Sequence, residues 1–200
     1  MERMRHAEAG GRIVWLKDGR SVALRAAGSG DVPAVRQFVR SLSDQARRNR
    51  FFTPIRELSS DQLERLTRSH PPGELALVGE ALDGAAPRIV AMAQYVVCDP
   101  LDAEFAVVVD DAWQRQGLGI QLLNVLAECA AESGLAALNG FVLADNWPML
   151  ELLARLDCEL DTDSDPHVIR AIKRLTSSRA TSCDFALERS SASGIPALFH

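Results

Sequence analysis

Three apolar segments separated by short turns limit the folds open to this chain. They cover residues 75–82, 89–97 and 104–109, and the turns between them contain Asp-Gly and Asp-Pro. This spacing predicts three consecutive strands joined as an antiparallel meander. Apolar residues then recur at helical spacing over residues 117–133, and a strand-like run follows over residues 136–143. Because a strand, a helix and a strand in succession imply one parallel pairing, the sequence predicts a mixed sheet with helices on its faces.

The flanking segments complete an α/β fold. An Asp-Gly turn between two apolar runs predicts a hairpin over residues 13–25. Residues 29–67 fit a helix, then a second short helix or turn, then a third helix. A last helix and a last strand are expected over residues 148–156 and 168–175. The expected architecture is a twisted, mixed but mostly antiparallel sheet of about seven strands with helices on both faces.

Composition and charge exclude several function classes. Residues 12–175 are expected to form one domain between a flexible N-terminus of residues 1–11 and a Ser- and Ala-rich tail of residues 176–200. The formal net charge of −5 argues against a general nucleic-acid binder. No apolar run approaches the roughly 20 residues that span a bilayer, and the N-terminal segment lacks the apolar core of a signal peptide. We therefore expect a cytoplasmic protein without membrane or nucleic-acid partners, and the sequence leaves its oligomeric state open. The four cysteines lack metal-ligand spacing and are interpreted as thiols rather than as a disulfide frame.

A glycine-containing loop directly follows the last strand of the meander and opens the long helix. Its spacing is Gln-x-x-Gly-x-Gly, beginning at Gln114. Glycines let the backbone approach a ligand closely, and the free N–H groups at a helix start favour a phosphate. Gln114, Arg115 and Gln116 can add donors. From these residues alone, a phosphate-binding loop and a tight turn that needs glycine only for its geometry are equally supported.

Three longer segments resemble the GNAT superfamily of N-acetyltransferases. They are RSLSDQARRNRFFTPIRELSSDQLERLT, AEFAVVVDDAWQRQGLG and VLADNWPMLELLARL, and they look like the acetyltransferase domain of bacterial protein lysine acetyltransferases. The resemblance covers residues 12–175. It implies a GNAT-type sheet, acetyl-CoA as co-substrate and no metal. The reaction it implies is transfer of an acetyl group to a primary amine, above all a protein lysine, by direct attack in a ternary complex.

The resemblance also assigns the cofactor-binding residues. In this superfamily the strand before the loop carries a β-bulge and splays from its neighbour, which admits the pantetheine arm. Backbone groups of Val107 and Val109 would bind the pantetheine and polarise the thioester carbonyl. Asn146 would bond the pantetheine amides, although Asn before Pro148 is also good helix-capping chemistry. The loop that would bind the pyrophosphate consists of Gln114, Arg115, Gln116, Gly117, Leu118, Gly119 and Ile120.

Glu104 interrupts the apolar strand and is the candidate catalytic residue. By itself, a lone acid in a strand could simply point to water. By the resemblance, it matches the glutamate that acts as general base. A lysine amine has a pKa of about 10.4 and arrives as ammonium, so it cannot attack a thioester until a carboxylate removes a proton, directly or through a water. Partial burial is expected to raise the pKa of Glu104.

The acceptor side and one departure from the family pattern keep other functions open. Arg50, Phe51 and Phe52 match the segment where early helices line the acceptor cleft. Leu153 stands where many members of the superfamily have a tyrosine that protonates the leaving thiolate. The sequence therefore also allows acetylation of a small amine, or a non-catalytic acyl-CoA-binding module that regulates a partner.

Overall fold

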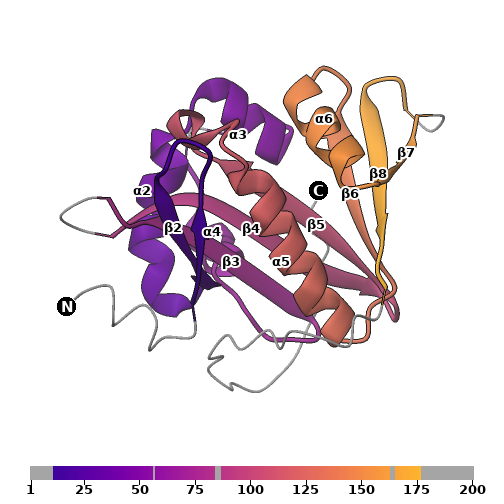
Figure 1. Cartoon of the computed structure of the whole chain (residues 1–200), viewed down its shortest axis with the longest axis horizontal. Coiled ribbons are helices and arrows are strands. Elements are labelled where there is room, and N and C mark those ends of the chain that lie inside the picture. Colours follow the sequence, from indigo (N-terminus) through magenta and orange to yellow (C-terminus); the bar gives the residue numbers. More distant parts are fainter. Residues whose placement is uncertain (1–10, 56, 84–86, 163–164, 177–200) are drawn as a thin grey trace.

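One eight-stranded sheet forms the centre of the protein (Figure 1). The computed structural model describes residues 11–55, 57–83, 87–162 and 165–176. The strands are β1 (Arg12–Trp15), β2 (Ser21–Ala26), β3 (Glu74–Ala81), β4 (Arg88–Asp99), β5 (Asp102–Val109), β6 (Ala137–Leu143), β7 (Glu159–Asp161) and β8 (Val168–Arg174). Their order in the sheet is β1-β2-β3-β4-β5-β6-β8-β7, and within the described residues only β5 and β6 pair in parallel.

These strands confirm the predicted α/β class and the mostly antiparallel sheet. The sequence predicts about seven strands, whereas the structure has eight. The additional strand is β7, which has three residues and pairs only with β8. So short a segment carries no recognisable alternation of apolar and polar residues.

Five α-helices and two short 3-10 helices connect the strands of the described chain. Ser43 and Ser59 cap two of the helices, because each side-chain oxygen accepts a backbone N–H of the first turn. The Ser43 cap explains why the segment predicted as a short helix or turn is a helix. The helices are η1 (Ser29–Asp31), α2 (Val32–Ser41), α3 (Asp44–Phe51), α4 (Ser60–Leu66), η2 (Asp111–Trp113), α5 (Leu118–Glu132) and α6 (Trp147–Arg155).

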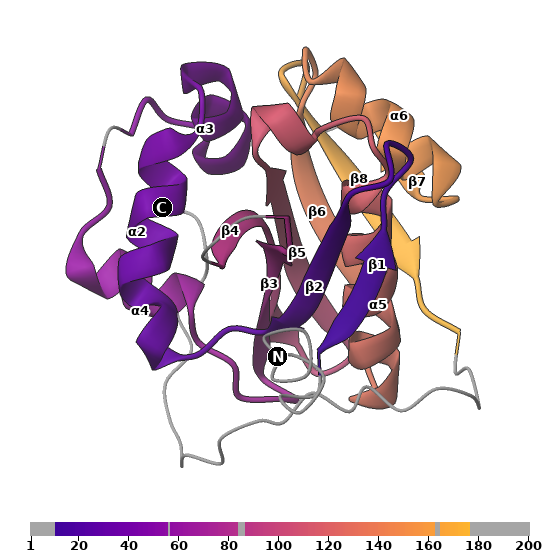
Figure 2. The ribbon, with the colours of Figure 1, turned by 60° about the vertical axis from the view of Figure 1, so that its left-hand side comes forward.

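Helices cover both faces of the sheet, as the sequence predicts. Figure 2 shows α2, α3 and α4 on one side of the strands and α5 on the other. The apolar stripe of α5 packs with β3, β4 and β5 in the larger core, while α2 and α4 form a second core on the opposite face. Residues of β5 alternate between these cores: Phe105 belongs to the α5 side and Val108 to the α2 side.

Three other expectations have different outcomes. Cys129 is disulfide-bonded, so the interpretation of every cysteine as a thiol is wrong, while Cys98 and Cys158 are free. Within the described residues, no helix has both the length and the apolarity to cross a membrane. The predicted flexible segments, 1–11 and 176–200, lie outside the described residues except for their innermost positions.

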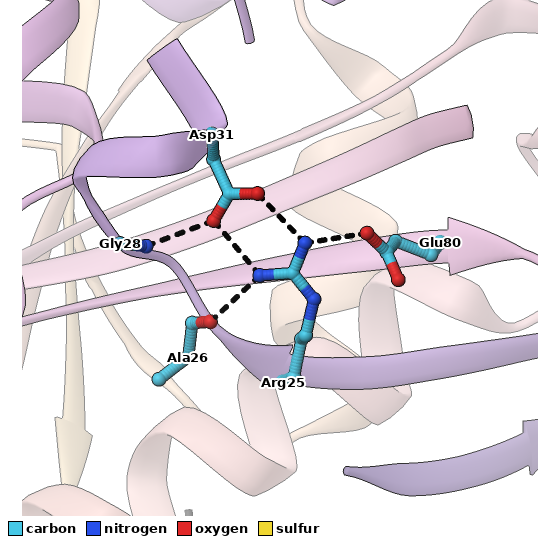
Figure 3. A network of polar contacts seen from close by, with 5 residues as sticks. All are labelled: Arg25, Ala26, Gly28, Asp31 and Glu80. Atoms are coloured by element: carbon cyan, nitrogen blue, oxygen red, sulfur yellow. Dashed lines mark hydrogen bonds and ion pairs between the residues drawn. The ribbon is translucent and has the colours of Figure 1, made fainter. Parts of the chain in front are cut away.

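A network of ion pairs joins the start of α2 to the sheet (Figure 3). The Arg25 guanidinium of β2 donates to both carboxylate oxygens of Asp31, at 2.8 and 2.7 Å, and to Glu80 of β3. Asp31 also accepts the backbone N–H of Gly28. Burial acts to raise the pKa of Asp31, but the hydrogen bonds from Arg25 and Gly28 outweigh it and hold that pKa below its usual value.

Replacing Arg25 with alanine is expected to lower the free energy of unfolding at pH 7 by about 2–4 kcal/mol, because the buried Glu80 and the partly buried Asp31 lose the Arg25 cation. The Asp31 contribution is present above the ordinary carboxyl pKa and is lost as the pH falls through the lower folded pKa. The loss in Arg25→Ala should therefore shrink at acidic pH. Urea titrations at several pH values measure both effects.

Arg40→Ala is the matched control, since it breaks an ion pair with Glu57 in which both side chains are more than half exposed. Its effect should stay below about 1 kcal/mol. Equal losses of unfolding free energy in the two variants would show that the Arg25 network stabilises the fold no more than an exposed ion pair does.

Candidate functional site

A cavity of about 570 Å³ lies between the ends of β5 and β6. Residues 105–109 of β5 form its floor, and α3 and α6 contribute its two walls. The loop between η2 and α5 closes one end, together with Lys17 from the turn between β1 and β2. The cavity is thus built from segments that lie far apart in the sequence.

The cavity exists because β5 and β6 separate. Their parallel pairing comprises only three residue pairs and ends at Glu104 and Asn139. The Asp110 N–H donates to Val90 of β4, so alternation along the strand turns the backbone groups of Val107 and Val109 the other way, toward the opening. This is the splayed strand that the resemblance implies.

The expected β-bulge is not at this position. Residues 103–109 of β5 pair with β4 without interruption, and the register shift between these strands lies at Val97 and Asp99 instead. The separation of β5 from β6 therefore needs no irregularity on the β4 side.

The two glycines of the loop have different roles. Gly117 has φ of +92°, a left-handed conformation that favours glycine, and an added Cβ would meet nothing within 4 Å. It precedes the first turn of α5 and lines the cavity, so the exposed N–H groups there have room for an anion. At Gly119, an added Cβ would lie 2.7 Å from the Leu152 side chain of α6. Gly117 therefore fits the ligand interpretation. Gly119 also lines the cavity, and its lack of a side chain lets Leu152 pack against the start of α5.

The other loop residues divide between the cavity and the scaffold. Arg115 and Ile120 line the cavity, whereas Leu118 is buried in the core. The Gln114 amide lines the cavity but donates to the Val109 carbonyl at 3.0 Å, so it supports the loop. The Gln116 carbonyl accepts the N–H of Lys17.

Asn146 lines the cavity and also caps α6. Its side-chain oxygen accepts the N–H of Met149 at 3.4 Å. The capping alternative is therefore realised. Leu153, at the position of the family's tyrosine, is fully buried, and Tyr95 is buried and hydrogen-bonded with Ser133. The chain has one tyrosine, so none lines this cavity.

Glu104 lies at the inner end of the opening, where the pairing of β5 and β6 ends. Burial raises its pKa, as the sequence predicts, and the attraction of Arg50 opposes this. One carboxylate oxygen, Oε1, is buried and has no hydrogen-bond partner in the part of the chain that the structure describes. Arg50 and Phe52 line the cavity, while Phe51 packs against the α2 core. Glu104 itself does not line the cavity, so its link to the site runs through Arg50 and the strand end.

Sequence reasoning missed several wall residues. Two polar residues of α3 face the cavity, as do an aromatic residue of β6 and a cation of α6; they are Gln45, Asn49, Phe141 and Arg155. Their positions depend on where α3 and α6 dock. Two polar contacts at α3 contribute to that docking: the hydroxyl of its N-cap residue Ser43 donates to Asp111, and Arg48 pairs with Asp145 at 2.9 Å.

Comparisons with known proteins agree with this geometry. Residues 38–157 match the acetyltransferase (GNAT) family. An acetyltransferase of Pseudomonas aeruginosa is 29% identical over 160 residues, which cover 78% of this chain and 86% of that protein. The GNAT domain of S. lividans PAT has a TM-score of 0.76 at 23% identity, covering 83% of this chain and 97% of that one. YncA of Salmonella typhimurium, solved with its cofactor acetyl-CoA, has a TM-score of 0.60 at 17% identity, covering 80% and 96%.

Gly117→Asp is expected to weaken CoA binding by tenfold or more, because it places a negative charge where the helix start favours an anion. Isothermal titration calorimetry with CoA measures this. Gly134→Asp is the matched control, since Gly134 also has positive φ and open space but lies beyond the far end of α5. An unchanged CoA affinity in Gly117→Asp would rule out the phosphate-binding interpretation.

Proposed function

The chain belongs to the GNAT family of acetyltransferases and is an acyl-CoA-dependent N-acetyltransferase, and from this premise we propose that its acceptor is the side-chain amine of a protein lysine. The observation that carries the proposal is Glu104, a half-buried carboxylate with a raised pKa where the pairing of β5 and β6 ends, directly before the residues of β5 that line the cavity. Such a group suits an acceptor that arrives as an ammonium ion.

The cavity fits a CoA thioester at both ends. Its loop end combines the open space at Gly117 with the cations Lys17 and Arg115, which suits phosphates. Its strand end offers a slot between β5 and β6, where Val107 and Val109 turn backbone groups toward the opening. We propose that these groups bind the pantetheine arm and stabilise negative charge on the thioester oxygen.

The proposed role of Glu104 is to accept a proton from the acceptor ammonium. The nitrogen then uses its lone pair to attack the thioester carbon, and the C–S bond breaks to release the CoA thiolate. The second proton that the nitrogen loses on becoming an amide passes to that thiolate or to water. No tyrosine is needed to protonate that thiolate, because a thiol with a pKa of about 8.5 is a tolerable leaving group.

An open acceptor side supports a protein substrate. Phe141 of β6, which lines the cavity, is 42% exposed, and its register partner Arg170 of β8 is exposed. A lysine on a protein surface can reach the inner end of such a site while the rest of the substrate stays outside. The structural similarity to the GNAT domain of S. lividans PAT, a protein acetyltransferase, supports the same acceptor class.

Glu104→Gln is expected to lower kcat/KM at neutral pH by about 10²–10⁴-fold, because the amide cannot take the proton. CoA affinity should be unchanged. In the wild type, the acidic limb of the pH profile should lie above the ordinary carboxyl pKa of 4.5, since the pKa of Glu104 is raised. Asp102→Asn, two residues earlier in β5, is the control and should keep most of the rate. Full activity in Glu104→Gln would refute its assignment as the base.

Assays with acetyl-CoA and three acceptor groups test the substrate class. Folded proteins and lysine peptides should release CoA thiol and carry acetyl-lysine by mass spectrometry, and small amines such as polyamines should react poorly. Turnover confined to small amines would favour the alternative acceptor class. Tight CoA binding without turnover on any acceptor would favour a regulatory acyl-CoA-binding module.

A further inference from the structure

Arg50 is a buried cation at the wall of the cavity. It is 8% exposed, lies in the last turn of α3 and lines the cavity. In the described part of the chain, its guanidinium makes no hydrogen bond and no ion pair. The Arg50 Cζ atom lies 5.0 Å from the centre of the Phe51 ring, and the guanidinium is attracted electrostatically to Glu104.

Such a cation is unfavourable for folding. Burial lowers the pKa of Arg50 to about 10, and the attraction of Glu104 opposes this only in part. A buried charge without a contact partner destabilises a fold. An apolar side chain of similar size at this position would make the folded state more stable. The position of Arg50 therefore calls for a functional explanation.

Polar groups from three elements meet on this face of the sheet with hydrogen-bonding capacity left over. The Glu104 Oε1 atom of β5 and the Gln94 Nε2 atom of β4 are both buried without a hydrogen-bond partner among the described residues. Gln94 pairs with Ala106 in register, so alternation puts it on the same face as Glu104. Arg50, Gln94 and Ala106 also border a small void beneath α3.

The separation between Arg50 and Glu104 is the informative feature. A guanidinium in contact with the carboxylate would occupy its lone pairs and pull its pKa far down, which would make it a poor base. At a greater distance, the positive charge still favours ionisation but leaves the oxygens free. We propose that Arg50 is a positioning residue that keeps Glu104 ionised in a half-buried site while leaving the carboxylate free to accept the acceptor's proton. This rests on the proposed function, in which Glu104 is the base.

The other neighbours of Glu104 do not supply this charge. On β4, burial and then the charges of Asp99 and Glu104 raise the pKa of the Cys98 thiol, which is therefore neutral at pH 7. On β6, Asn139 lies opposite Glu104 and accepts a hydrogen bond from Arg170 of β8. Arg50 is the charged group whose attraction opposes the effect of burial on the pKa of Glu104.

Carbon-13 NMR of glutamate-labelled protein tests the proposal without requiring turnover, with the Glu104 signal assigned from Glu104→Gln. Arg50→Gln should move the Glu104 titration upward by about one pH unit, and Arg50→Lys should restore part of the change. Arg48→Gln, on the same helix but paired with Asp145, should leave the titration unchanged. If Arg50→Gln does not fold, Arg50→Lys supplies the test. Because this variant keeps the positive charge, its Glu104 signal should titrate above that of the wild type but below the value expected for a buried carboxyl without a cation.

Kinetics provide the second readout. The acidic limb of the kcat/KM profile should move together with the NMR titration. At a pH below the acidic limbs of both the wild type and Arg50→Gln, the variant should therefore have a roughly tenfold lower kcat/KM. In a Glu104→Gln background, Arg50→Gln should cause no further loss. An unchanged Glu104 titration, an additional loss in that background, or an effect on acceptor KM alone would overturn the proposal. Absence of turnover on every acceptor would refute the proposed function, while the NMR result would still decide the coupling.

Discussion

The short pairing of β5 with β6 is the constraint on which the site depends. Hydrogen bonding between them ends at Glu104 and Asn139, and the following residues of β5 face a cavity instead of a neighbouring strand. Packing fixes the junction, because a Cβ at Gly140 would lie 2.5 Å from the Phe105 ring. Backbone groups left unpaired in a cleft are available to a ligand. The interruption thus creates the slot and places Glu104 at its inner end.

Two arginines near carboxylates illustrate how distance sets the role of an ion pair. Arg25 contacts both oxygens of Asp31, and these hydrogen bonds hold the pKa of Asp31 low. That arrangement fastens α2 to the sheet. Arg50 acts on Glu104 only through its charge, and burial keeps the pKa of Glu104 raised. The first pair suits a structural link, and the second leaves a carboxylate that can exchange a proton.

The sequence predicted most of the fold because local signals were strong. Apolar periodicity identified the meander, α5 and the final strand–helix–strand order, and Asp-Gly marked the first hairpin. The signal failed for β7, which is too short, and for Cys129, because no cysteine spacing in the sequence indicates its disulfide. For the loop, spacing could not separate the role of Gly117 from that of Gly119, since the difference arises from the position of Leu152 on α6.

The sequence by itself determined most of the strands and helices, that a glycine-containing loop precedes α5, and that an acid interrupts β5. These features follow from interactions between residues close along the chain. Only the tertiary structure decided that α3 brings Arg50 toward Glu104, that Lys17 joins the loop end of the cavity, and that Glu104 stands where two strands part. These relations depend on the docking of elements far apart in sequence, which burial and packing fix and local propensity does not encode.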